Sequence, residues 1–288
     1  MLVTLKEILA IAEEKKIAIG AFNAANLESL EGNIAGAEAL GLPLILQFAQ
    51  CHEPWVRLHL LGPVMVAAAK EAKVPVCVHL DHGETLEYLH DALELGFTGV
   101  MFDGSTLPYE ENVANSKKAA DMAHAYGASC EAELGSMGRR ESGMGDGSGE
   151  GDETKIYTDP VQAKEFVERT GIDALACSFG TTHGIYLKAP RLDFDVVRNV
   201  RKMTNNIPVV MHGGSGVSPE GFRQAVDAGV RKINYFTYMD KAGGAAAAEA
   251  LKKMQDEGAP VFFSTISMAA RQGMKENVME AMKVFAGM

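Results

Sequence analysis

The stretch that decides the fold is Pro75–Gly104, PVCVHLDHGETLEYLHDALELGFTGVMFDG. It opens with a short apolar run rich in β-branched residues, continues with apolar residues at helical spacing, and passes through Gly96 into a second apolar run. Short apolar runs separated by a helix are typical of a parallel sheet. Glycine just past a helix takes the left-handed conformation at little cost. The stretch therefore predicts a strand–helix–strand unit.

The same alternation runs through the whole chain. Eight parallel strands are the number at which such a sheet closes, and an α/β barrel takes about 250 residues, so 288 residues suit one domain. We predict a single (β/α)₈ TIM barrel over residues 1–288, with a helical C-terminal segment from about residue 260. An open doubly wound sheet is the alternative, because periodicity does not show closure. The predicted strands are Ile17–Asn23, Pro43–Ala49, Pro75–His82, Gly99–Gly104, Ala128–Leu134, Ala174–Gly180, Pro208–Gly213 and Lys232–Thr237, and the predicted helices include Leu27–Leu40, Val56–Ala72, Thr85–Leu95, Asn112–Tyr126, Pro160–Thr170 and Pro219–Ala228.

Composition narrows the class of partner. The net charge is −11 without a basic stripe, which argues against nucleic acid. No apolar run approaches the roughly 18 residues that a membrane span needs, and the N-terminus lacks a charged-then-apolar signal. The four cysteines are scattered and predict reduced thiols rather than a disulfide framework. We expect a cytoplasmic protein with neither a membrane nor a nucleic-acid partner.

One long polar segment, residues 135–153 (GSMGRRESGMGDGSGEGDE), interrupts the alternation. It follows the fifth predicted strand, so in a barrel it belongs to the catalytic face, where long loops often act as lids. We favour a mobile lid over the alternative of a disordered surface insertion. Arg139 and Arg140 in this loop either bind a phosphate or carboxylate group, or simply solvate an acidic loop.

Three histidines lie at or just beyond the C-terminal ends of predicted strands, and each is followed by glycine: His82, His183 and His212. In a closed barrel they point towards one mouth. Three neutral imidazoles leave zinc an open position for substrate, which is the arrangement of a catalytic site. Asp81 directly precedes His82. Its carboxylate either reaches the substrate, caps a helix or fixes the tautomer of a histidine. The other histidines, His52, His59, His79, His90 and His124, lack the pattern and are interpreted as structural, with His79 a candidate to support a ligand.

A phosphate site is predicted at His212–Gly216 (HGGSG), which precedes Ser218 and Pro219, a helix cap and first helical residue. Glycines let backbone N–H groups approach an anion, and the helix dipole favours its charge. Barrels commonly bind phosphate in the loops after their seventh and eighth strands. The sequence thus predicts a phosphorylated ligand.

At these residues the chain closely resembles the class II, metal-dependent ketose-bisphosphate aldolases, and the resemblance covers nearly its whole length. The motifs that carry it are Ile19–Asn23 (IGAFN), His79–Gly83 (HLDHG), Val100–Ser105 (VMFDGS), Glu131–Gly135 (EAELG), Gly180–Gly184 (GTTHG) and His212–Gly216. The resemblance implies reversible cleavage of fructose 1,6-bisphosphate or tagatose 1,6-bisphosphate, which differ at C4, to dihydroxyacetone phosphate and an aldehyde such as glyceraldehyde 3-phosphate. It also implies a place in carbohydrate metabolism such as glycolysis.

The resemblance assigns roles residue by residue. It implies zinc on His82, His183 and His212, Asp81 as the acid–base group for the C4 hydroxyl, and Glu141 in the loop as the base for dihydroxyacetone phosphate. It places Glu133 near the metal, and a monovalent cation, Na⁺ or K⁺, nearby. Arg271 resembles an arginine that reaches the second phosphate in a neighbouring subunit, which implies a homodimer or homotetramer. The residues implied in substrate or phosphate binding are Asn23, Gly184, Gly213, Ser215, Asn234, Thr237 and Arg271.

Three departures from the family pattern put the substrate in doubt. Ala49–His52 replaces a Ser-Glu-Gly turn, Arg139 and Arg140 replace glycines, and Phe236 stands where a small or acidic residue is usual. A different sugar phosphate or sugar-acid phosphate is therefore an alternative substrate.

Other classes of function fit the residues less well. A metal-dependent hydrolase usually has a His-x-His pair on its first strand, and Ile17–Asn23 has no histidine. A silent sugar-phosphate sensor predicts loss of Asp81 or a ligand histidine. A Schiff-base aldolase needs a lysine in the barrel, and only Lys232 lies in an apolar strand run, at its N-terminal end.

Overall fold

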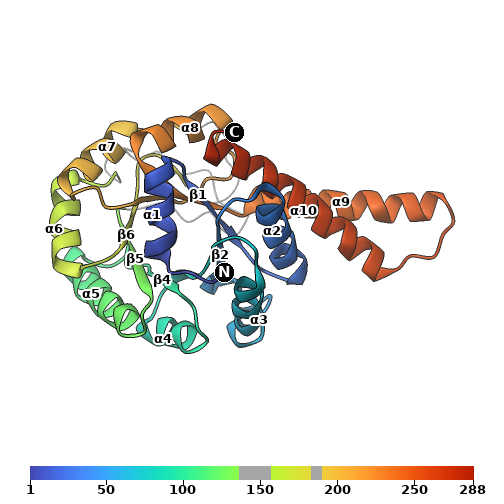
Figure 1. Cartoon of the computed structure of the whole chain (residues 1–288), viewed down its shortest axis with the longest axis horizontal. Coiled ribbons are helices and arrows are strands. Elements are labelled where there is room, and N and C mark those ends of the chain that lie inside the picture. The colour runs from blue at the N-terminus through green and yellow to red at the C-terminus, as the bar shows by residue number, and fades with distance from the viewer. Residues whose placement is uncertain (136–156, 183–189) are drawn as a thin grey trace.

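Eight parallel strands close into a barrel in the order β1 to β8, with β8 pairing back to β1 (Figure 1). The structure is a computed structural model that describes residues 1–135, 157–182 and 190–288. It confirms the predicted single-domain (β/α)₈ barrel and excludes the open sheet. The strands are β1 Ile19–Asn23, β2 Leu44–Ala49, β3 Val76–Gly83, β4 Gly99–Phe102, β5 Ser129–Leu134, β6 Ala174–Cys177, β7 Val209–Met211 and β8 Val230–Tyr235.

Helices surround the barrel. Three of them, α2, α6 and α8, have the predicted bounds, since each has a capping side chain at its start and a glycine at its end. None of the described helices is long and apolar enough to cross a membrane. The helices are α1 Leu5–Lys15, α2 Leu27–Leu40, α3 Leu58–Glu71, α4 Leu86–Glu94, α5 Tyr109–Ala125, α6 Pro160–Thr170, α7 Phe194–Met203, α8 Pro219–Ala228, α9 Thr237–Asp256 and α10 Phe263–Ala286, with a short 3₁₀ helix, η1, at Gln50–His52.

The first helix closes one end of the barrel. Leu5, Ile8 and Leu9 of α1 are buried in a cluster with inward-facing strand residues. The backbone N–H of Leu5 bonds to the carbonyl of Thr98, just before β4, so α1 covers the N-terminal ends of the strands. Only the opposite end, at the carboxyl ends of the strands, is left for a ligand, as in other barrels of this type.

The main apolar core lies between the strands and the outer helices. Every strand is buried along nearly its whole length, as expected for a parallel sheet covered on both faces. At the C-terminus, α9 and α10 form a hairpin that projects from the barrel, and the end of α10 returns to pack beside α2 and β1 (Figure 1).

The last strand begins earlier than predicted. It starts at Val230 and ends at Tyr235, and Thr237 is the first residue of α9. The charge of Arg231 concealed the first two residues of the strand, since the prediction began at Lys232. Arg231 reaches α1, where its Nε donates to Glu13 at 2.7 Å, and Lys232 is fully buried on the other side of the strand.

Candidate functional site

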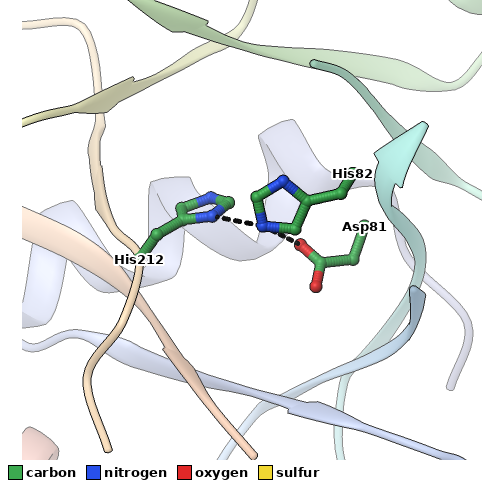
Figure 2. A group of neighbouring side chains, drawn as sticks. All are labelled: Asp81, His82 and His212. Carbon is green, nitrogen blue, oxygen red and sulfur yellow. Dashed lines mark hydrogen bonds and ion pairs between the residues drawn. The ribbon is translucent and has the colours of Figure 1, made fainter. Parts of the chain in front are cut away.

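Two strand ends bring three of the predicted site residues together. Asp81 and His82 lie near the end of β3, and His212 directly follows β7 (Figure 2). His82 Nε2 lies 2.9 Å from His212 Nδ1 and 4.0 Å from Asp81 Oδ1. Donor atoms of these three side chains are close enough to one another to hold a metal ion. The site therefore lies at the open end of the barrel.

A local distortion of β3 lets neighbouring residues face the same site. In a regular strand, Asp81 and His82 would point to opposite faces. Here the pairing with β4 shifts register between Leu80 and Gly83, and His82 takes a left-handed backbone with φ of +48°. Such a conformation is strained for histidine and is typical of functional sites.

Carboxylates orient both imidazoles. Asp103 lies 2.8 Å from His82 Nδ1, and Glu131 lies 2.9 Å from His212 Nε2. Each carboxylate accepts a hydrogen bond from the N–H beside it, so that in the neutral imidazoles the lone pair lies on the facing nitrogens, His82 Nε2 and His212 Nδ1. Metal-ligating histidines are held in this way, so the two imidazoles fit the role of ligands to a divalent cation.

The charges around His82 also suit a cation. Burial lowers the pKa of His82, but Asp81, Asp103 and Glu133 outweigh it and raise the pKa to about 10. Burial opposes ionisation of Asp81, but the imidazoles of His82 and His212 lower its pKa to about 2. The cluster thus carries a surplus of negative charge that a bound metal ion would balance.

Glu133, which the family resemblance places near the metal, lies beside this cluster. Its side chain is buried, and its Oε2 has no hydrogen-bond partner among the described residues. Burial, with Asp103 close by, raises the pKa of Glu133 to about 8. Donor atoms of His82, Asp103 and Glu133 form a second group able to hold a cation. An orphaned buried carboxylate oxygen is a further sign that the site is built around a metal.

Three amide side chains fix the carboxylate of Asp81. Asn234 Nδ2 donates to Oδ1 at 2.9 Å, while Asn23 Nδ2 and Gln47 Nε2 donate to Oδ2 at 3.1 Å. Gln47 also donates to Asn23 Oδ1 at 3.0 Å, so the amides orient one another. Three donors stabilise the ionised form and leave Asp81 ready to accept a proton from a substrate.

A charged network lies beneath the histidines, inside the barrel. Lys232 Nζ lies 2.8 Å from Glu131 Oε2, and His79 Nε2 lies 3.4 Å from the same oxygen. All three side chains are fully buried. Lys232 therefore lies inside the barrel rather than at a strand end, but its ammonium is held in an ion pair. His79 supports His212 through Glu131.

The loops after β7 and β8 hold the other predicted anion-binding residues. Gly213 has a φ of +63°, and a Cβ there would lie 2.4 Å from the carbonyl oxygen of Thr182. Ser215 Oγ accepts a hydrogen bond from the backbone N–H of Phe236 at 3.3 Å, next to Thr237 at the start of α9. A glycine turn thus meets a helix N-terminus, as an anion site requires.

The remaining predicted residues are placed elsewhere or not described. Arg271 lies on α10 and forms an ion pair with Glu31 of α2. Its contact with a neighbouring subunit stays a prediction. Glu141, His183, Gly184, Arg139 and Arg140 lie outside the described residues, as does the predicted lid apart from Gly135.

Comparison with known proteins identifies the family. The family model described as "Fructose-bisphosphate aldolase class-II" matches residues 3–287. The chain belongs to the class II fructose-bisphosphate aldolase family. It is thus a carbon–carbon lyase of a metal-dependent family whose substrates are sugar phosphates.

Individual relatives of this aldolase leave the substrate open. It is 38% identical to the probable fructose-bisphosphate aldolase of Bacillus subtilis over 99% of this chain and 97% of the relative. It is 37% identical to the uncharacterized protein YdjI of Escherichia coli, over 95% and 94% of the two chains. The crystal structure of the YdjI aldolase superposes with a TM-score of 0.84 at 36% identity, covering 99% of this chain and 97% of that one.

The sequence did not point to four residues of the candidate site. Gln47, Glu131 and Lys232 are polar residues inside otherwise apolar strands, and this pattern was the available signal, because such residues are rarely fully buried without a partner. Asp103 lay within a quoted motif, but no role followed from its position. Its bond to His82 joins residues that are 21 positions apart.

Proposed function

We propose that this aldolase cleaves a ketose 1-phosphate between C3 and C4, releasing dihydroxyacetone phosphate and an aldehyde, with fructose and tagatose 1,6-bisphosphate as the first substrates to test. The observation that carries the proposal is the arrangement of Asp81, fixed by three amides, 4.0 Å from an imidazole nitrogen that faces His212. An acid–base group and a metal site side by side are what aldol cleavage needs.

We propose zinc as the metal, held by His82 and His212 of the described cluster together with His183. Imidazole nitrogens suit zinc, and three neutral ligands leave a position for substrate. When bound, the metal would stabilise the negative charge that develops on the ketone oxygen.

The proton transfers would be carried out by side chains. Asp81 would take the proton of the C4 hydroxyl as the C3–C4 bond breaks, so that C4 becomes the aldehyde carbonyl and the electron pair moves towards C2. Glu141 would then give a proton to C3 to release dihydroxyacetone phosphate, and would take that proton as the base in the reverse condensation. Gly213, Ser215 and the start of α9 at Thr237 would hold the C1 phosphate. A homodimer or homotetramer, with Arg271 reaching a neighbour, and a monovalent cation remain part of the proposal.

Two measurements test the function. Chelation should abolish solvent-proton exchange of dihydroxyacetone phosphate and cleavage of the bisphosphates, and zinc should restore both. Activity that survives complete removal of metal would contradict the proposal, as would trapping of substrate on the protein by borohydride, because that marks a Schiff-base lysine.

A further inference from the structure

Three aromatic rings stand together beside Asp81 at the mouth of the barrel. The ring of His52 stacks on Trp55, with centroids 4.6 Å apart and an interplanar angle of 16°. Phe236 packs against both, with centroids 4.7 Å from His52 and 6.2 Å from Trp55. We call His52, Trp55 and Phe236 the aromatic wall.

The topology places the aromatic wall next to the acid–base group. Ala49 pairs with Asp81 across β2 and β3, and η1 with His52 follows at once. Phe236 comes two residues after Asn234, whose amide donates to Asp81. The negative charge of Asp81 also acts on His52, because it raises the pKa of the imidazole against the larger effect of burial. If Asp81 takes the C4 proton, the part of the substrate beyond C4 must lie near these rings.

The exposure of the rings suits ligand binding rather than core packing. His52 is only 4% exposed, and its Nδ1 has no hydrogen-bond partner in the described part of the chain. Trp55, stacked on it, is 65% exposed. An exposed aromatic ring held rigidly by a buried partner, beside a polar atom without a partner among the described residues, offers a ligand a stacking surface and a hydrogen-bonding group.

The charge at the aromatic wall argues against a second phosphate. Burial lowers the pKa of His52 to about 4, so its ring is neutral at pH 7 and offers no cation. A phosphate dianion placed against these three rings would meet uncharged surfaces, whereas phosphate sites normally offer cations or several N–H groups.

We propose that the aromatic wall binds the aldehyde half of the substrate, and that this half is a neutral polyhydroxylated aldehyde whose C–H faces pack on the rings. The proposal rests on the proposed aldolase function and specifies the substrate class of the same site. Dihydroxyacetone phosphate would still occupy the anion site after β7 and β8.

The kinetic test uses the full-length, zinc-loaded enzyme. With dihydroxyacetone phosphate saturating, kcat/KM should be higher for D-erythrose, a neutral tetrose, than for glyceraldehyde 3-phosphate. Trp55→Ala should lower kcat/KM for D-erythrose about tenfold, the upper range of an aromatic contact. Trp55→Phe keeps an aromatic ring and should retain most of the kcat/KM for D-erythrose. The matched control is Tyr126→Ala, which removes an exposed ring at the end of α5 and should leave both aldehydes unaffected.

A binding test needs no turnover. Trp55 is the only tryptophan in the chain, so its fluorescence reports on the aromatic wall alone. Erythritol, an unreactive tetritol, should produce a saturable change, and glycerol 3-phosphate should not. The proposal is overturned by preference for glyceraldehyde 3-phosphate, by less than a twofold effect of Trp55→Ala, or by a fluorescence signal that does not saturate. Proton exchange of dihydroxyacetone phosphate needs no aldehyde, so loss of that exchange in the native enzyme would instead refute the aldolase proposal.

Discussion

Replacing Lys232 with methionine tests the charged network beneath the histidines. Lys232 and Glu131 are both fully buried, and their charged atoms are 2.8 Å apart. Methionine has a similar volume but no charge, so Glu131 would keep a buried carboxylate without its cation. Breaking a buried pair in this way costs about 3–5 kcal/mol. We expect the free energy of unfolding of Lys232→Met to fall by that amount in urea titrations of the metal-free protein.

Two further variants separate the loss of an ion pair from a general loss of packing. The double variant Lys232→Met, Glu131→Gln removes both charges and should recover at least about 2 kcal/mol, because a neutral pair has a much smaller desolvation cost. The control Lys117→Met breaks an exposed pair with Asp121 on α5 and should change stability by less than about 1 kcal/mol. A loss below 1 kcal/mol in Lys232→Met, or a double variant no more stable than the single one, would refute the reasoning.

Two more predictions concern the site. Asp81→Ala should keep its bound zinc, measured by elemental analysis, but lower turnover by roughly 10²-fold, the usual contribution of a positioned acid–base group. His212→Ala should lose the metal; if Asp81→Ala loses it too, Asp81 is a ligand and the assigned role is wrong. Burial lowers the pKa of folded His52 to about 4, so between pH 6.5 and about 4 the unfolded residue binds a proton that the folded ring does not. As the pH decreases through this range, the free energy of unfolding should fall by up to about 3 kcal/mol. His52→Phe should remove that part of the pH dependence, and an unchanged stability profile would contradict a neutral, buried His52.

Local sequence predicted much of the fold because each element has its own short-range signal. In α2, α6 and α8, a capping residue, apolar spacing and a terminal glycine lie within one stretch, and the bounds agree with the prediction. The first two residues of β8, Val230 and Arg231, were missed because a charged residue at that point looks like the end of a loop until its partner is known. That partner, Glu13, is distant in the chain.

For the candidate site too, local sequence predicted some features, and others depend on contacts between distant residues. His82 and His212 could be predicted from the sequence because histidines followed by glycine recur at or just beyond predicted strand ends, and a parallel barrel brings all such ends to one mouth. Asp81 is assigned through its place beside His82 and the family resemblance. That pattern could not decide whether Asp81 and His82 face the same side, since the answer depends on a register shift between β3 and β4. The amides around Asp81 come from β1, β2 and β8 and meet only when the barrel closes.

The sequence by itself predicted the alternation of strands and helices, the histidines at or just beyond strand ends and the glycine turn after the seventh strand, because these depend on residue type, periodicity and spacing along the chain, whereas closure of the barrel is seen only in the structure. Only the tertiary structure decided which carboxylates orient the imidazoles, that Lys232 is held in an ion pair, and that His52, Trp55 and Phe236 form one surface beside Asp81. The physical reason is that burial, pKa and orientation depend on neighbours in space. Those neighbours come from strands and loops that lie far apart in the chain.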